Sequence, residues 1–230
     1  MVITMPKISV TWYGHSAFKV EVGDKTILFD PWFGNPKNPI KDVKIEKCDL
    51  ICVTHGHGDH GLSEAIEVSK RTNAPIVGIF ELANEAEAKG AKAIGMNIGG
   101  TTEVNGIKVY MNEATHSSPY GAPVSFIVEV NGVTLCHLGD TGLFGSMAFL
   151  SELFNIDVIF LPIGDHFTLG PRTAAYATKL LKPKVVIPMH YGTFPVLTGT
   201  PDKFVEELKK QGVEVRVEVL SPGETKEIEV

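Results

Sequence analysis

Five strand-like apolar runs in this 230-residue chain are each followed, within a few residues, by a histidine or an aspartate. Ligands of α/β sheets bind outside the carboxyl ends of strands, where the loops converge on a rigid scaffold. Histidines scattered through a core would show no such bias toward strand ends. The sequence therefore predicts a polar site at one sheet edge. The runs are Leu50–Thr54 before His55, Ile107–Asn112 before His116, Val133–Leu138 before Asp140, Val158–Ile163 before Asp165 and His166, and Val185–Met189 before His190.

Further apolar runs of strand length alternate with helix-like windows along the chain. The other strands are expected at Ile8–Tyr13, Ala17–Val22, Thr26–Phe29, Ile76–Phe80, Val124–Val130 and Val213–Val219, and the helices at Leu62–Arg71, Glu81–Lys89, Pro171–Leu181 and Pro201–Lys210. About eleven strands exceed the ~5–6 of an average sheet, so two sheets are expected, with the helices outside both. The predicted fold is mixed α/β, a four-layer αββα sandwich. No linker or low-complexity stretch interrupts residues 1–230, which indicates a single domain.

Two segments of the chain resemble each other. The segment from Asp49 to His60 and the segment from Asp157 to His166 each carry a buried strand that runs into a Gly-Asp-His turn. This echo indicates two related halves, with chance similarity as the alternative.

The charge balance excludes several classes of partner. The net charge is −6, from 21 basic and 27 acidic residues, and no cluster of Lys and Arg marks a nucleic-acid footprint.

No apolar run approaches the ~18 residues of a membrane span, and residues 1–7 lack the pattern of a secretory signal. Three cysteines, Cys48, Cys52 and Cys136, are an odd number without paired spacing, which suits a reducing compartment. We therefore expect a cytoplasmic protein that acts on a small molecule, which can be anionic.

The sharpest local signal is the hexapeptide His55-Gly-His57-Gly-Asp59-His60. Imidazole and carboxylate groups suit a divalent ion of intermediate softness, and the intervening glycines let the backbone fold tightly so that several side chains face one point. An exposed polar turn is the alternative interpretation. The four strand ends elsewhere in the chain that also carry such groups favour a metal site.

Seven side chains are candidate metal ligands, which is too many for one tetrahedral ion with an open position. They fit two ions about 3.5–4 Å apart with Asp140 between them. None is a cysteine, which excludes a structural zinc site of the cysteine type. The candidates are His55, His57, Asp59, His60, His116, Asp140 and His190.

With these residues the chain resembles the metallo-β-lactamase superfamily over nearly its whole length. Several longer motifs resemble its ascorbate-phosphate lactonase-like branch of stand-alone metal-dependent hydrolases. The motifs are Trp12-Tyr-Gly-His15-Ser, Asp30-Pro31, Gly139-Asp140-Thr141-Gly142, the segment from Pro162 to Pro171 that includes Asp165-His166, and Pro188-Met-His190-Tyr.

The resemblance implies an αββα sandwich with its metals at the edge between the two sheets. It implies His55, His57 and His116 on one ion, Asp59, His60 and His190 on the other, and Asp140 bridging them. It implies two divalent ions per chain, zinc or manganese, with iron or nickel as alternatives.

Four residues outside the ligand set are assigned supporting roles. His15 lies in a Gly-His-Ser turn, where we weigh a substrate or proton role against a structural one. Asp30 is expected to accept a hydrogen bond from a ligand histidine, because ligand imidazoles usually have such an outer partner. A turn-capping role is the alternative for Asp30. Asp165 and His166 share a loop at the predicted site edge, which favours an outer or substrate-facing position, with a purely structural role in the loop as the alternative.

The resemblance to this branch implies hydrolysis of a small lactone or ester, and paired ions suit attack by a hydroxide that bridges them. Asp59, Asp140 and His166 are the expected catalytic residues, with His166 or His15 as proton donor to the leaving group. One alternative is a phosphodiesterase that acts on small or cyclic nucleotides. Two others are a mononuclear iron oxidoreductase on the same fold, which would leave Asp59 and His60 without a ligand role, and a metal-dependent binding protein. We expect neither nucleic acid nor membrane as partner, and we expect a homo-oligomer.

Overall fold

The computed structural model describes residues 6–230, whose strands form two seven-stranded sheets. The first sheet has the order β14 (Thr225–Glu229), β1 (Lys7–Gly14), β2 (Ala17–Val22), β3 (Lys25–Phe29), β4 (Leu50–Cys52), β5 (Ile76–Ile79) and β6 (Ala93–Met96). The second has the order β13 (Arg216–Val217), β12 (Val185–Met189), β11 (Val158–Pro162), β10 (Val133–His137), β9 (Val124–Val130), β8 (Ile107–Glu113) and β7 (Thr101–Val104).

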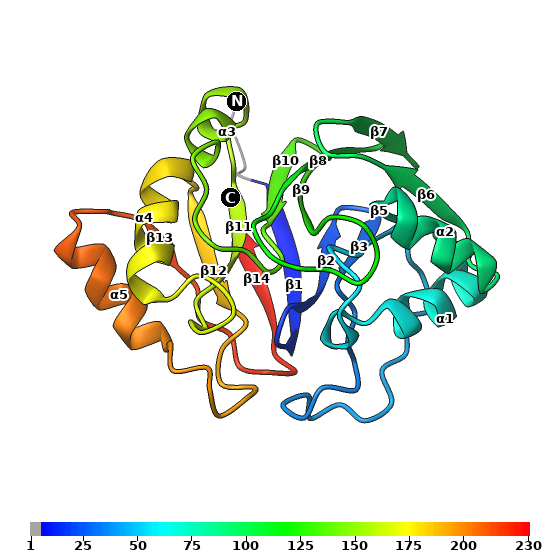
Figure 1. The fold of residues 1–230 in the computed structure, drawn as a ribbon, viewed down its shortest axis with the longest axis horizontal. Helices are drawn as coiled ribbons and strands as arrows, with labels where there is room; N and C mark the ends of the chain where they lie inside the picture. Colours follow the sequence, from blue (N-terminus) through cyan, green and yellow to red (C-terminus); the bar gives the residue numbers. More distant parts are fainter. Residues whose placement is uncertain (1–5) are drawn as a thin grey trace.

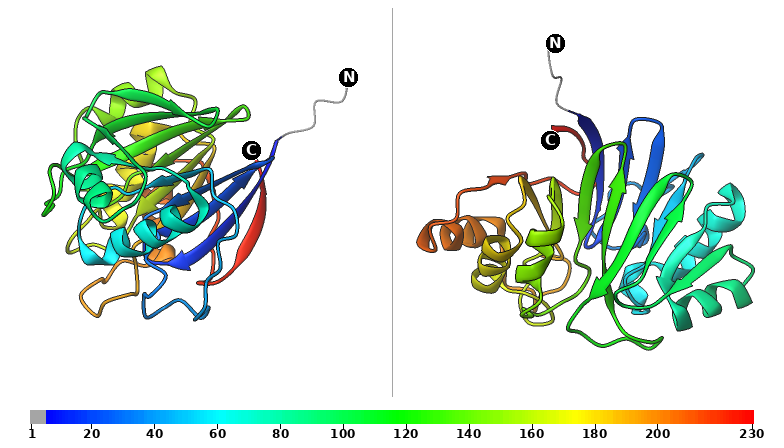
Figure 2. Two further views of the ribbon diagram at one scale, coloured as in Figure 1. Left: turned by 90° about the vertical axis from the view of Figure 1, so that its right-hand side faces the viewer. Right: turned by 90° about the horizontal axis from the view of Figure 1, so that it is seen from above.

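Helices cover the outer face of each sheet, and the two sheets face each other in the middle of the molecule (Figure 1). On one side lie α1 (Leu62–Thr72) and α2 (Phe80–Ala88), and on the other α3 (Met147–Leu153), α4 (Pro171–Leu181) and α5 (Pro201–Lys210). The views from the side and from above show the same layers (Figure 2). The predicted αββα sandwich is confirmed.

The two sheets share one topology. β1, β2 and β3 form an antiparallel meander that continues into the parallel strands β4, β5 and β6. In the same way, β8, β9 and β10 are antiparallel and continue into the parallel strands β11, β12 and β13. Even a detail at the start of each parallel pair is repeated. The Asp49 carboxylate accepts a hydrogen bond from the Thr26 amide at 2.9 Å, and Asp157 accepts one from the Thr134 amide at 2.7 Å.

Aromatic side chains fill the space between the sheets. The Phe160 ring on β11 lies 4.5 Å from that of Phe18 and 5.8 Å from that of Phe29, which belong to the opposite sheet. All three side chains are fully buried. Such a core holds both sheets rigidly, so that the loops at their carboxyl ends are fixed relative to one another.

Several short elements were absent from the sequence prediction. They are β6, β7, β14 and α3, and of the expected strand Val213–Val219 only Arg216–Val217 is a strand. Except for α3, these are the edge strands of the two sheets, and their side chains are partly exposed, so their pairing depends on the neighbouring strand and not on a strong apolar pattern.

The sequence analysis also considered membrane spans and a secretory signal. Within residues 6–230, no helix has both the length and the apolar character needed to cross a bilayer. Residues 1–5, which include most of the segment judged for a secretory signal, lie outside the described residues.

Candidate metal centre

The hexapeptide containing His55 forms the connection between β4 and α1. The chain leaves β4, passes His55 and His57, and turns through a short 3₁₀ segment, Gly58–His60, before α1 begins. Gly61 has a φ of 68°, and a Cβ at this position would overlap the backbone of Pro31. Only glycine meets both conditions, so the tight turn that directs these side chains inward depends on it.

The first group of converging donor atoms comes from His55, His57 and His116. Nε2 of His55 lies 2.9 Å from Nδ1 of His57. The ring of His116, which follows β8 in the second sheet, lies 5.2 Å from both other rings. Residues from both sheets therefore build this group, as predicted from the strand ends.

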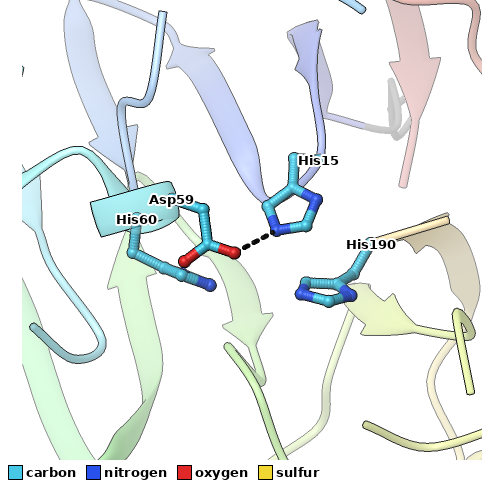
Figure 3. A group of neighbouring side chains, drawn as sticks. All are labelled: His15, Asp59, His60 and His190. Atoms are coloured by element: carbon cyan, nitrogen blue, oxygen red, sulfur yellow. Dashed lines mark ion pairs between the residues drawn. The ribbon is translucent and has the colours of Figure 1, made fainter. Parts of the chain in front are cut away.

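The second group comes from His15, Asp59, His60 and His190, which point toward a common centre in Figure 3. Nε2 of His15 lies 3.3 Å from Oδ2 of Asp59, and the rings of His15 and His190 are 3.9 Å apart. His190 follows β12, and Gly164 after β11 lies against it. A Cβ on Gly164 would overlap the His190 carbonyl oxygen, so this close approach requires glycine.

Asp140 lies between the two groups. Its Oδ1 is 3.2 Å from Nε2 of His60, and its Oδ2 is 3.0 Å from Nε2 of His190 and 3.6 Å from Nε2 of His116. One carboxylate therefore faces histidines of both groups. All seven residues predicted as ligands are brought together at one edge.

The donor atoms fit divalent ions. In the part of the chain that the structure describes, the buried atoms without a hydrogen-bond partner include Nε2 of His60, Nε2 of His190 and Oδ1 of Asp140. Buried polar atoms are seldom left unpaired, because each costs free energy. Ligands about 2.0–2.1 Å from a tetrahedral ion lie roughly 3.3 Å from one another, close to the separations around Asp140. This arrangement suits cations at the centre of each group.

Asp30 supports the site from behind, at the end of β3. Its Oδ2 accepts hydrogen bonds from Nδ1 of His60 and from the Thr54 hydroxyl, both at 2.7 Å, and its Oδ1 accepts the Thr54 amide at 2.7 Å. The hydrogen bond expected between Asp30 and a candidate ligand histidine is therefore present. It holds the proton on Nδ1 of His60 and directs Nε2 toward the centre, where a bound cation would replace a proton on that nitrogen.

The electrostatics keep the carboxylates ionised. Burial opposes ionisation of Asp140, but the neighbouring His190 and His60 outweigh it and hold its pKa well below the usual range. Burial likewise opposes ionisation of Asp30, and His60 outweighs it, so the pKa of Asp30 is lowered.

Burial also keeps two histidines neutral. It lowers the pKa of His55 to about 2 and that of His15 to about 4. Neutral imidazoles and ionised carboxylates are the protonation states that metal binding needs.

The sequence analysis placed His15 near the site, but not among the donor groups. The structure places its ring inside the second group, with Nδ1 3.0 Å from the Thr193 hydroxyl. Neither Thr193 nor Thr54 was singled out from the sequence, because isolated threonines in loops carry no recognisable pattern.

Asp165 and His166 lie on an exposed loop after β11, both with left-handed backbone (φ of 67° and 59°). Within residues 6–230, neither belongs to a donor group. Asp165 lines a cavity of about 620 Å³ together with Gly142 and Arg172. Asp165 therefore lies outside the donor groups. His166 also lies outside them, so its expected catalytic role stays a prediction.

Comparison with known proteins decides the family. Residues 9–190 match the β-lactamase superfamily domain. The chain belongs to this superfamily. It is 48% identical to a UPF0173 metal-dependent hydrolase of Korarchaeum cryptofilum over 222 residues, which cover 96% of this chain and 100% of that protein. It is 47% identical to a UPF0173 metal-dependent hydrolase of Caldivirga maquilingensis, covering 93% of this chain and 95% of the relative.

A solved structure agrees with this assignment. Igni18, a metallo hydrolase of Ignicoccus hospitalis, is 39% identical, covers 97% of this chain and 99% of its own, and superposes with a TM-score of 0.89. The β-lactamase superfamily member described here is thus an enzyme of the metal-dependent hydrolase type, as the sequence analysis predicted.

Proposed function

We propose that this superfamily member binds two divalent ions, zinc or manganese, and hydrolyses a small lactone or other small ester. The observation that carries the proposal is the position of Asp140 between two donor groups, with its carboxylate within 3.6 Å of histidines from both. His55, His57 and His116 would hold one ion and Asp59, His60 and His190 the other, with Asp140 shared.

When bound, such ions activate water as a nucleophile at neutral pH and polarise a carbonyl or phosphoryl oxygen. The protein contributes the geometry. Asp140 stays ionised, Asp30 orients His60, and Gly164 lets the β11 loop approach His190. Since Asp59 and His60 converge with His190, the arrangement favours two ions over the single iron of an oxidoreductase.

A leaving group needs a proton, and His166 and His15 were the candidates. His15 is buried against Asp59, whereas His166 is exposed on the β11–α4 loop, so a role for His166 requires the substrate to extend toward that loop. The catalytic role of His166 stays a prediction.

A cavity of about 620 Å³ is lined by Gly142, by the β11–α4 loop with Asp165 and by α4 and α5, and its lining residues do not include the donor residues. Its charged side chains are balanced, with Arg172, Lys203 and Lys210 against Asp165, Glu206 and Glu207. We propose a small molecule, which can be anionic, as the substrate, and a homo-oligomeric state stays a prediction.

The test is elemental analysis of protein purified without chelators, followed by turnover assays after each metal is added back. We expect two ions per chain and turnover of members of a lactone and ester panel. Turnover confined to cyclic nucleotides or nitrophenyl phosphodiesters would instead establish the phosphodiesterase alternative. One iron per chain with oxygen consumption would refute hydrolysis.

A further inference from the structure

The second donor group contains one histidine more than the proposed function uses. We propose that His15 is itself a ligand of the second ion, which five side chains then hold: the shared Asp140 together with His15, Asp59, His60 and His190. The two metal positions would then differ, because Asp140 and three histidines hold the first. This inference rests on the two-ion site proposed above and concerns the share of the chain's own residues in it.

The first argument is the state of Nε2 of His15. This nitrogen is completely buried and has no hydrogen-bond partner in residues 6–230. It lies 3.3 Å from Oδ2 of Asp59, but the contact lacks the geometry of a hydrogen bond. A buried nitrogen that faces a carboxylate and two other histidines without bonding to any of them is best satisfied by a cation.

The second argument is the tautomer. Nδ1 of His15 lies 3.0 Å from the Thr193 hydroxyl. If Nδ1 donates its proton to that oxygen, Nε2 carries a lone pair directed at the second group, as a metal ligand must. In the opposite tautomer Nε2 would donate to Asp59, and His15 would only position that carboxylate.

The third argument is how firmly the backbone holds this ring. His15 has a φ of 53°, a conformation that costs free energy in a residue other than glycine and persists where the surroundings enforce it. Its carbonyl oxygen accepts hydrogen bonds from the His190 amide at 3.1 Å and from Nε1 of Trp12 at 3.0 Å. His15 and His190 are therefore tied together although they belong to different sheets.

The unequal sets have a chemical consequence. With Asp140 shared, the second ion would have five side-chain ligands and the first ion four, and catalytic zinc can expand to five-coordinate. The second position would retain its ion more strongly, and the less crowded ion at His55, His57 and His116 would be the one that accepts water or substrate as a fifth ligand.

The decisive experiment is NMR of the full-length protein loaded with ¹¹³Cd, in which each imidazole bound to cadmium shows a coupling between its ring protons and the metal. We expect two cadmium resonances and six coupled histidines, His15 among them. His137 and His166, which belong to no donor group, serve as uncoupled internal controls. Two resonances with only five coupled histidines and an uncoupled His15 would overturn the ligand assignment and leave the two-ion site intact. A single resonance would overturn the two-ion site, and this inference with it.

Variants give a second measurement that does not depend on activity. In His15→Gln, the affinity for the second ion should fall by more than about 100-fold, beyond the 10–100-fold typical of losing an outer partner. Thr193→Val, which removes only that outer partner, should lower the affinity less and preserve the His15 coupling. A loss below about 100-fold in a folded His15→Gln protein, judged by circular dichroism, would contradict the proposal.

Discussion

The carboxylate of Asp30 accepts a hydrogen bond from Nδ1 of His60 at 2.7 Å, deep behind the candidate metal centre. Both side chains are completely buried. The pair links the end of β3 to the turn that carries Asp59, so the orientation of one candidate ligand depends on a residue that cannot reach the ions.

Replacing Asp30 should therefore weaken metal binding without removing a ligand. In Asp30→Asn the His60 ring loses its anionic partner, and we expect metal affinity to fall by about 10–100-fold. Competition with a chromophoric chelator measures this. Asp49→Asn is the matched control, since Asp49 caps Thr26 at the start of the same strand, far from the ligands. Equal affinities of the two variants would contradict the role of Asp30.

Asp140→Ala should remove the group shared by both donor sets. We expect turnover to be abolished and metal content to fall toward one ion per chain, because the remaining histidines no longer share a counter-charge. Elemental analysis and the ester assay report the two effects separately. Full activity with two ions bound would disprove the bridging position.

Two glycines at the site edge allow a matched comparison. Gly164→Ala should displace His190, since the added methyl group overlaps the His190 carbonyl oxygen, and so should lower metal affinity by at least about 10-fold. In Gly142→Ala the nearest atom to the added methyl is the Thr115 carbonyl oxygen at 3.8 Å, an ordinary contact, so affinity should stay unchanged. The reverse order would show that the β11 loop does not support His190.

The contact between the sheets can be tested by truncating phenylalanines. Phe160 is 0% exposed between the sheets, whereas Phe149 on α3 is 63% exposed. We expect Phe160→Ala to lower the free energy of unfolding by about 3–5 kcal/mol and Phe149→Ala to change it by less than about 0.5 kcal/mol. Urea unfolding of the metal-free proteins measures both, and similar losses would refute the assigned core.

The free energy of unfolding should fall at alkaline pH because of a buried thiol that is not a candidate ligand. Burial raises the pKa of the Cys136 thiol from 9.0 to about 12. Between these values the unfolded chain releases a proton that the folded chain keeps, so the free energy of unfolding falls as pH rises from 9 toward 12. Cys136→Ala should reduce this slope by up to about 1.4 kcal/mol per pH unit. Unfolding at pH 8, 9.5 and 10.5 provides the measurement, and identical slopes would contradict the prediction.

Most of the fold could be predicted because its central strands are long and apolar. The runs around Val124–Val130 and Val185–Met189 have the bounds expected from hydrophobicity alone. The two-residue strand β13 and the polar strand β14 could not be predicted, since their pairing is decided by β12 and β1. The helix α3 was missed because its seven residues are too few for a clear helical period.

The location of the candidate metal centre could be predicted from the sequence, but the position of His15 within it could not. Residues at strand ends, such as His116 and His190, follow from topology, because β8 and β12 run in the same direction and so end at the same edge of the sheet. The inward position of His15 depends on a left-handed turn and on a hydrogen bond to a residue 175 positions later in the chain, as the His190 amide bonds its carbonyl oxygen. Local sequence contains neither relationship.

The donors are divided between the sheets: His15, His55, His57, Asp59 and His60 follow strands of the first, and His116, Asp140 and His190 follow strands of the second. Ions bound between residues of both sheets would hold the two sheets together, and their binding energy would add to the free energy of unfolding. Removal of the ions with a chelator should then increase local opening at the edge that carries the donors, while the opposite end of the sheets stays folded. We expect amide hydrogen exchange to become faster at His15 and His190 than at Asp49 and Asp157.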